Sequence, residues 1–248
     1  MPDREVRAVF FDFGGTLFTY GDVRGRWFYP LLVEAVERLG VDVEPKVAGR
    51  AYTEASQESF QAFHDRPYYL HRELFQDAFR RFGEAVGGKP TQEFLDWFHE
   101  QQRKLVYDGF QLRPDCVETL RALRGAGIHV AIVSNIDDDY LHPMLERCGL
   151  TEHLDAWTSS EEARSCKPDV EIFHYAMRKA GVRPEESVFV GDSPEHDVVG
   201  ARRLGMHTVL IHSPLAEPPG SGAGESAEPD HTIDRLEELI PIVRSVGS

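Results

Sequence analysis

Residues 9–17 decide the fold, and they read Val-Phe-Phe-Asp-Phe-Gly-Gly-Thr-Leu. The apolar run ends on Asp12, and Gly14 and Gly15 then open a tight turn. A buried strand that ends in a carboxylate above a glycine turn presents that carboxylate at its carboxyl end, the edge where open α/β sheets bind ligands. We therefore predict that Asp12 is a nucleophile or a metal ligand.

The length and charge of the chain limit its class. The 248 residues are enough for one large domain or two small ones. The chain carries 27 Lys and Arg residues against 42 Asp and Glu residues, a formal net charge of −15. This charge argues against nucleic acid or an anionic membrane as the main partner. A small anionic substrate stays compatible, because a bound divalent cation can reverse the field inside a pocket.

The cysteines and the N-terminus indicate a cytoplasmic protein. Cys116, Cys148 and Cys166 form no paired metal spacing, and an odd, sparse set is typical of a reduced compartment. The first residues, Met-Pro-Asp-Arg-Glu, lack the basic start and apolar core of a signal peptide. No apolar stretch is long enough to span a bilayer, so we expect no membrane partner.

Residues from about 23 to 108 show helical periodicity and almost no strand signal. Leu31, Leu32 and Ala35 recur at helical spacing, and Gly40 is a typical helix stop. The block is rich in aromatic residues, most of which should form a core between helices. Further helices are predicted at about 46–63, 68–86 and 91–106, where Thr91 should cap the start.

After Pro114 the pattern alternates between helices and strands. Alternation of this length is typical of a parallel, doubly wound sheet. Residues 213–230, which are rich in Pro, Gly and Ser, should form a loop without a site. Strands are predicted at 128–133, 154–158, 187–190 and 207–211, and helices at 116–126, 140–148, 169–180, 197–204 and 234–246.

The predicted fold is therefore α/β, with a doubly wound parallel (Rossmann-like) sheet core and an inserted all-helical cap. The core comprises residues 1–19 and 109–248, and the cap comprises residues 20–108.

Polar residues follow the predicted strands where each strand ends. Asp12 follows the first strand, Ser134-Asn135 follows another, and Asp192 follows a third. Lys167 lies in a loop that opens a helix. In a parallel sheet these positions reach the same edge, so we expect them to converge on one crevice.

These residues resemble the motifs of the haloacid dehalogenase superfamily, in the branch with a helical cap inserted after the first motif. Asp12 to Leu17 matches the first motif, and Ser134-Asn135 matches the second. Lys167-Pro168 matches the third, and Gly191-Asp192-Ser193 with Asp197 matches the fourth. Each motif is common by itself, but their order and their places at strand and helix ends make the set specific. The resemblance covers nearly the whole chain.

The resemblance implies a Mg²⁺-dependent phosphatase that forms an aspartyl-phosphate on Asp12. Asp12, Asp192 and the backbone carbonyl of Gly14 would hold the Mg²⁺, which prefers oxygen ligands. Gly14 and Gly15, with Thr16, would form the turn that faces the substrate.

Four other residues receive roles from the same resemblance. Ser134 and the amide of Asn135 would bind the transferring phosphoryl group. Lys167 would neutralise its charge and restrain the nucleophile. Asp197 would orient a metal-bound water or Lys167 from behind the ligands.

Gly14 departs from the family pattern, which usually has a second aspartate here as the general acid and base. Acid–base catalysis contributes roughly 10² to 10⁴-fold. We therefore expect a slow enzyme, or one selective for leaving groups that depart without a proton.

Two alternatives remain. One is a hydrolase of C–P bonds that resembles phosphonoacetaldehyde hydrolases, which need a cap lysine such as Lys46, Lys89 or Lys104. The other is a weakened protein that binds phosphate or metal without turnover. Dehalogenation is disfavoured, because dehalogenases of the superfamily lack the acidic fourth motif that Asp192 and Asp197 supply here. We expect a small phosphorylated substrate, no nucleic-acid partner, and a monomer or homodimer.

Overall fold

The computed structural model describes residues 5–19, 28–213 and 227–246. The chain divides into two compact units, Met1–Thr19 with Gln111–Ser248, and Tyr20–Phe110. They are named here the α/β unit and the helical unit. Most of the loop predicted at 213–230, and the predicted start of the cap at residues 20–27, lie outside the described residues.

The α/β unit contains a six-stranded sheet whose paired strands are all parallel, in the order β5-β4-β1-β6-β7-β8. β1 lies between β4 and β6, so that Ala8 is opposite His129 on one side and Ser187 on the other. The predicted α/β fold with a parallel sheet is confirmed. The strands are β1 (Ala8–Phe11), β4 (His129–Ser134), β5 (Ala156–Ser159), β6 (Ser187–Gly191), β7 (His207–Ile211) and β8 (His231–Ile233).

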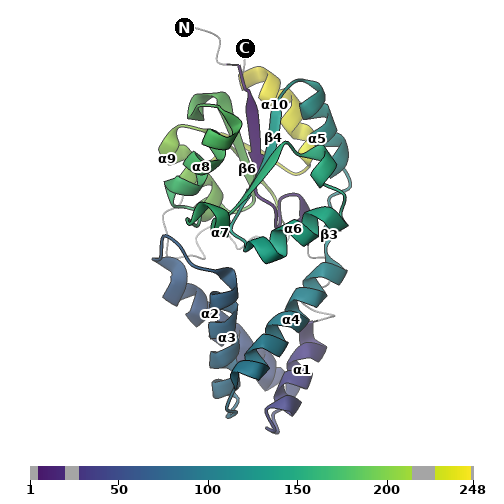
Figure 1. Cartoon of the computed structure of the whole chain (residues 1–248), viewed down its shortest axis with the longest axis vertical. Coiled ribbons are helices and arrows are strands. Elements are labelled where there is room, and N and C mark those ends of the chain that lie inside the picture. Colours follow the sequence, from purple (N-terminus) through teal and green to yellow (C-terminus); the bar gives the residue numbers. More distant parts are fainter. Residues whose placement is uncertain (1–4, 20–27, 214–226, 247–248) are drawn as a thin grey trace. The chain divides into compact units, whose positions relative to one another are not determined.

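Helices cover both faces of this sheet. Figure 1 shows α8 and α9 on one side of the sheet and α5 and α10 on the other. All four residues of β1 are buried, as expected for a central strand covered on both faces. Phe10 of β1 packs in the same buried cluster as Phe173 of α8 and Phe189 of β6. The helices are α5 (Cys116–Gly125), α6 (Asp138–Arg147), α7 (Ser160–Ala163), α8 (Val170–Ala180), α9 (Val199–Leu204) and α10 (Leu239–Val246).

A short antiparallel ribbon, which the sequence analysis did not predict, lies where the chain leaves and re-enters the α/β unit. It pairs β2 (Phe18–Thr19) with β3 (Gln111–Leu112). Each strand has two residues, too few for a periodic pattern. Their pairing joins positions far apart in the sequence, so local sequence could not indicate it.

The helix predicted at 197–204 begins differently in the structure. Pro194–Val198 form a π-helical turn, and the α-helix α9 starts only at Val199. The Ser193 hydroxyl accepts a hydrogen bond from His196 N at 3.2 Å and so caps this turn. The side chain of Asp197 is buried in the polar cluster described below, so tertiary contacts rather than periodicity set this end.

The helical unit contains α1 (Phe28–Arg38), α2 (Pro45–His64), α3 (His71–Ala85) and α4 (Gln92–Gly109), and the described residues of this unit include no strand. Thr91 caps α4, since its side chain accepts from Phe94 N at 3.3 Å. The core is aromatic, with the rings of Phe79 and Phe98 stacked at a centroid distance of 4.1 Å. Tyr29 and Phe60 are exceptions to the aromatic-core prediction, because their side chains are exposed.

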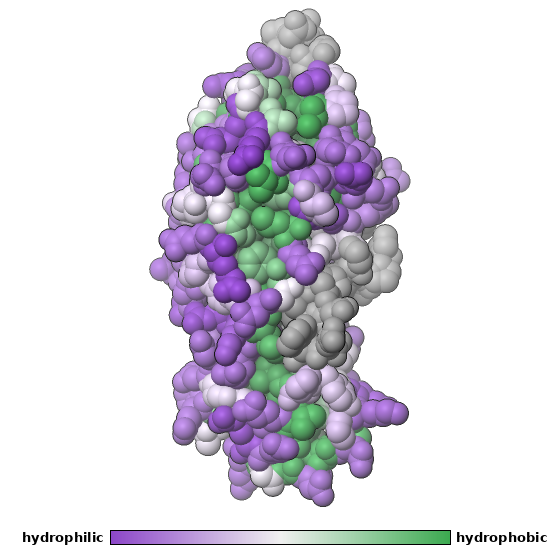
Figure 2. Space-filling model, turned by 90° about the vertical axis from the view of Figure 1, so that its right-hand side faces the viewer, coloured by the Kyte–Doolittle hydropathy of each residue, from purple (hydrophilic) through white to green (hydrophobic). Residues whose placement is uncertain are grey.

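Figure 2 shows one face of the molecule, where hydrophilic side chains cover much of the surface and hydrophobic side chains lie between them. Within the described ranges, no helix combines the length and the apolar character that crossing a membrane requires.

Candidate active site

The three central strands bring the predicted polar residues together. β4, β1 and β6 are neighbours in the sheet, and Ser134, Asp12 and Asp192 lie at or just after their carboxyl ends. Ser134 Oγ donates a hydrogen bond to Asp12 Oδ1 at 2.9 Å. Lys167, from the loop before α8, reaches the same oxygen with Nζ at 2.6 Å. The side chains of Asp12, Ser134 and Lys167 therefore converge as predicted.

Lys167 lies between two carboxylates. Its Nζ is 2.6 Å from Asp12 Oδ1 and also 2.6 Å from Asp197 Oδ1. The residue is only 4% exposed, and burial by itself would lower the pKa of Lys167. Attraction by Asp12 and Asp197 outweighs burial and raises this pKa to about 12, so the ammonium stays charged.

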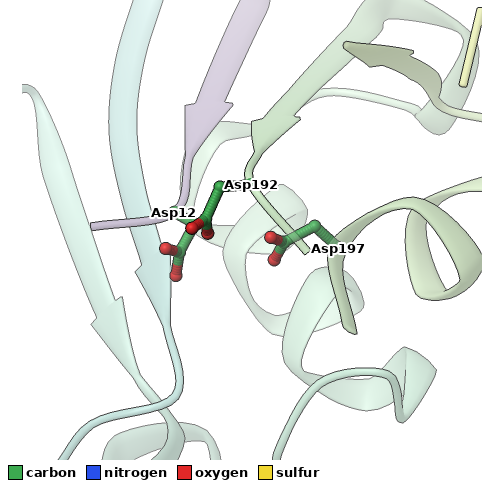
Figure 3. A group of neighbouring side chains, drawn as sticks. All are labelled: Asp12, Asp192 and Asp197. Carbon is green, nitrogen blue, oxygen red and sulfur yellow. The ribbon is translucent and has the colours of Figure 1, made fainter. Parts of the chain in front are cut away.

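A third carboxylate, that of Asp192, completes the cluster. Figure 3 shows the side chains of Asp12 and Asp192 next to each other, with Asp197 facing them. One carboxylate oxygen from each residue lies within 4.8 Å of the others. Burial, followed by repulsion from Asp12 and Asp197, raises the pKa of Asp192 to about 8. Burial likewise raises the pKa of Asp12, although Lys167 acts against this.

The charges and donor atoms of this cluster suit a divalent cation. Three carboxylates face a single ammonium group, so ionised side chains would leave an excess of two negative charges. Burial is the main cause of the raised pKa of Asp192, and the repulsion from this uncompensated charge adds to it. Carboxylate oxygens are the ligands that Mg²⁺ prefers, and a bound cation reverses the local preference for protons.

Asp197 is held so that it faces Lys167. Its Oδ2 accepts from Ser193 N at 2.9 Å while Oδ1 pairs with Lys167. Gly191 allows this approach, because a Cβ at that position would lie 2.2 Å from Asp197 Cγ. The expected position of Asp197 beside Lys167 is therefore present in the structure.

Asn135 has a contact that the sequence analysis missed. Its side-chain Oδ1 accepts from Lys167 N at 2.6 Å, and its Nδ2 donates to Lys167 O at 2.9 Å. The asparagine thus binds both backbone groups of Lys167 and fixes the loop that presents the ammonium. The position of Asn135 directly after the strand-end Ser134 could have indicated a role at the site. Its partner could not be predicted, because Lys167 is 32 residues away in the sequence.

The turn after β1 has two different glycines. Gly15 has a φ of +84°, which only glycine adopts readily, and its N–H donates to Phe18 O at 2.9 Å. A Cβ on Gly15 would lie 2.0 Å from Asp192 Oδ2, so this backbone is in direct contact with the carboxylate. Gly14 is half-buried, forms a bridge with Phe18, and has no positive φ. Thr16 is fully buried, and its Oγ1 has no hydrogen-bond partner in the described parts of the chain.

Comparison with known proteins connects this geometry to a family. The family model for haloacid dehalogenase-like hydrolases matches residues 6–205. A ribulose-1,5-bisphosphate 5-phosphatase from Halopiger xanaduensis is 31% identical over 95% of this chain and 98% of its own. A glyceraldehyde 3-phosphate phosphatase from Methanopyrus kandleri is 35% identical over 98% of this chain and 99% of its own. An (S)-2-haloacid dehalogenase 4A from Burkholderia cepacia is 36% identical, but over 60% of this chain and 65% of its own.

Proposed function

The chain belongs to the haloacid dehalogenase-like hydrolases, and from this premise we propose that it is a Mg²⁺-dependent phosphatase of a small phosphorylated metabolite. Two relatives that match it over nearly their full length carry phosphatase names. The observation that carries the proposal is the position of Asp12, whose Oδ1 receives hydrogen bonds from both Ser134 and Lys167.

In this proposal Asp12 is the nucleophile. Its carboxylate forms a bond to phosphorus while the ester P–O bond breaks, and the departing oxygen takes a proton from water. A second water then cleaves the aspartyl-phosphate, which releases inorganic phosphate and restores Asp12. Ser134 and Lys167 hold the carboxylate in one orientation, and the Lys167 charge stabilises the negative phosphoryl oxygens.

Asp12, Asp192 and the Gly14 carbonyl are proposed to hold Mg²⁺. The cation would supply positive charge to the phosphoryl oxygens and to the three carboxylates. Asp197 keeps Lys167 charged and directed at Asp12, as their 2.6 Å contact suggests. The substitution of Gly14 for the usual acid leaves this set of side chains intact, so it should affect leaving-group protonation rather than binding.

The helical unit is proposed to act as the cap that selects the substrate and excludes water. The C–P hydrolase alternative requires a lysine that forms a Schiff base, and such lysines are activated by desolvation. Lys46, Lys89 and Lys104 of the helical unit are all exposed. The cluster of Asp12, Asp192 and Asp197 favours the phosphatase over dehalogenation, which needs no metal site.

The test is hydrolysis of p-nitrophenyl phosphate by the purified protein with and without Mg²⁺. The leaving group of this ester departs with little help from an acid, so Gly14 should limit the rate least here. We expect Mg²⁺-dependent turnover that falls at least about 10³-fold in Asp12→Asn, since the nucleophile is lost.

Asp139→Asn is the matched control, because Asp139 is an exposed carboxylate of the same unit, in the first turn of α6. This variant should keep full activity. Turnover in Asp12→Asn equal to that of the native protein would exclude the proposed nucleophile.

A further inference from the structure

Arg113 joins three loops at the carboxyl edge of the sheet. Its Nη2 donates to the carbonyl oxygen of Gly15 at 2.9 Å and to that of His212 at 2.8 Å. Its Nη1 donates to Asp234 O at 3.4 Å. Gly15 lies in the turn after β1, His212 follows β7, and Asp234 follows β8. The sequence does not predict these contacts of Arg113, because all three acceptors are backbone atoms.

Two of these acceptors, the carbonyl groups of His212 and Asp234, follow strands that are hydrogen-bonded to each other. β7 and β8 pair in register up to Ile211 and Ile233, and His212 N donates to Ile233 O at 2.9 Å. The side chains of His212 and Asp234 also meet, with Nδ1 2.7 Å from Oδ1. Arg113 therefore links the turn after β1 to a part of the sheet edge that is fixed independently.

Arg113 holds the turn after β1 at two points. Its backbone N–H donates to Leu17 O at 3.0 Å, and its side chain holds the carbonyl of Gly15. The guanidinium is half-buried, which makes its charge-assisted hydrogen bonds harder for water to replace.

The held peptide is the one that contacts Asp192. A side chain on Gly15 would overlap Asp192 Oδ2, so the two groups pack without a gap. When Asp192 is ionised and no cation is bound, the like charges on Asp12 and Asp197 repel it. The place of the Asp192 carboxylate therefore depends on the backbone against which it packs.

We propose that Arg113 is a positioning residue for the metal site, which holds the Gly15 carbonyl and thereby keeps the turn packed against Asp192, beside Asp12. The inference rests on the proposed function in one respect, namely that Asp12 and Asp192 bind a divalent cation. Arg113 itself touches neither carboxylate through a hydrogen bond in the described structure; it acts through Gly15.

The experiment compares Mn²⁺ binding by Arg113→Met, Arg113→Lys and Arg202→Met, starting from EDTA-treated protein. Loss of the free Mn²⁺ EPR signal gives the Kd, and thermal unfolding gives the Tm of each variant. Arg202 is the matched control, because its Nη1 also donates to a backbone carbonyl, that of Glu228, at 2.6 Å and pairs with Asp230 at 3.0 Å. These contacts tie α9 to the segment before β8 and do not involve the turn after β1.

Arg113→Met should raise the Kd for Mn²⁺ at least tenfold, and Arg113→Lys should raise it less, because a lysine keeps the charge but cannot reach all three carbonyls. Arg202→Met should stay within twofold of the native protein at a similar loss of Tm. An unchanged Kd in Arg113→Met, or an equal loss in Arg202→Met, would overturn the proposal. If Arg113→Met does not fold, a Kd for Arg113→Lys within twofold of native overturns it as well.

The readout separates this inference from the proposed function. A native protein that binds Mn²⁺ but does not hydrolyse p-nitrophenyl phosphate would refute the phosphatase and leave the Arg113 result standing. A native protein that binds no Mn²⁺ would overturn the role of Arg113.

Discussion

Gly14 and Gly15 are adjacent, but the turn needs them for different reasons. Position 15 requires glycine twice over, because its φ is +84° and a Cβ would meet Asp192 at 2.0 Å. Position 14 has no positive φ and is half-buried, so an L-residue can occupy it without backbone strain. The local backbone therefore does not require a glycine at position 14, where the family usually has its acid.

Gly14→Asp should raise the turnover of alkyl phosphates by about 10²-fold, since it would supply a proton donor for a poor leaving group. The gain on p-nitrophenyl phosphate should be much smaller. The measurement is steady-state hydrolysis of a pair of esters with good and poor leaving groups in the presence of Mg²⁺.

Gly15→Ala is the neighbouring control and should lose activity towards both esters, because the new methyl group displaces Asp192. If Gly14→Asp binds metal as before and gains nothing on alkyl phosphates, the absence of a general acid does not explain the chemistry at this position.

At the scale of elements, sequence periodicity was sufficient to predict the helices and strands in which buried residues recur at a regular spacing. The strands after Pro114 are apolar runs bounded by glycine and polar residues, and they appear in the structure near their predicted positions. The side chains at their carboxyl ends could be placed together because parallel strands share an edge. Asp12, Ser134 and Asp192 lie close together for that reason.

Contacts between distant segments could not be predicted in the same way. The pairing of Asn135 with the backbone of Lys167 depends on how two loops approach each other. The π-helical turn before α9 depends on the burial of Asp197 beside Lys167, which no local pattern encodes. The role of Arg113 could not be predicted, because its guanidinium binds backbone carbonyl groups, which every residue type provides.

The ribbon of β2 and β3 leads to a prediction about the helical unit. Phe18 is opposite Leu112 and Thr19 is opposite Gln111, so the two ends of the α/β unit are already adjacent. Replacing residues 20–110 with an Asn-Gly type I′ turn should therefore close a hairpin without strain. We expect the shortened protein to unfold cooperatively and to bind Mn²⁺ as tightly as the full chain.

Circular dichroism during urea unfolding and a Mn²⁺ titration would check this expectation. The substrate range should widen or activity should fall, because the proposed cap is gone. A product that aggregates or lacks a cooperative transition would mean that the α/β unit needs the helical unit in order to fold.

At the scale of the whole molecule, the charge of the site affects the free energy of unfolding. Burial, and then repulsion from Asp12 and Asp197, raise the pKa of Asp192 to about 8, whereas an unfolded aspartate titrates near pH 3.9. Between these values the native state holds a proton that the unfolded chain does not hold. Unfolding then releases a proton, so a rise in pH favours the unfolded state.

The metal-free protein should therefore lose stability relative to Asp192→Asn as the pH rises from 5 to 8, by up to about 1.4 kcal/mol per pH unit. Urea unfolding in EDTA at several pH values measures this difference. Added Mg²⁺ should stabilise the native protein most at pH 8, because the cation binds the ionised carboxylate. Parallel pH profiles for the two proteins in EDTA would show that Asp192 is ionised throughout.

The order of the strands also matters during synthesis on the ribosome. β1 ends next to Asp12, but the ammonium that pairs with Asp12 is made 155 positions later in the chain. At roughly 5 to 20 residues per second, this interval is about 8 to 30 seconds. During this interval the central strand of the finished sheet is an apolar segment of the nascent chain whose terminal carboxylate lacks its lysine. The segment that decides the fold is therefore an apolar stretch that must avoid aggregation until its partners have been made.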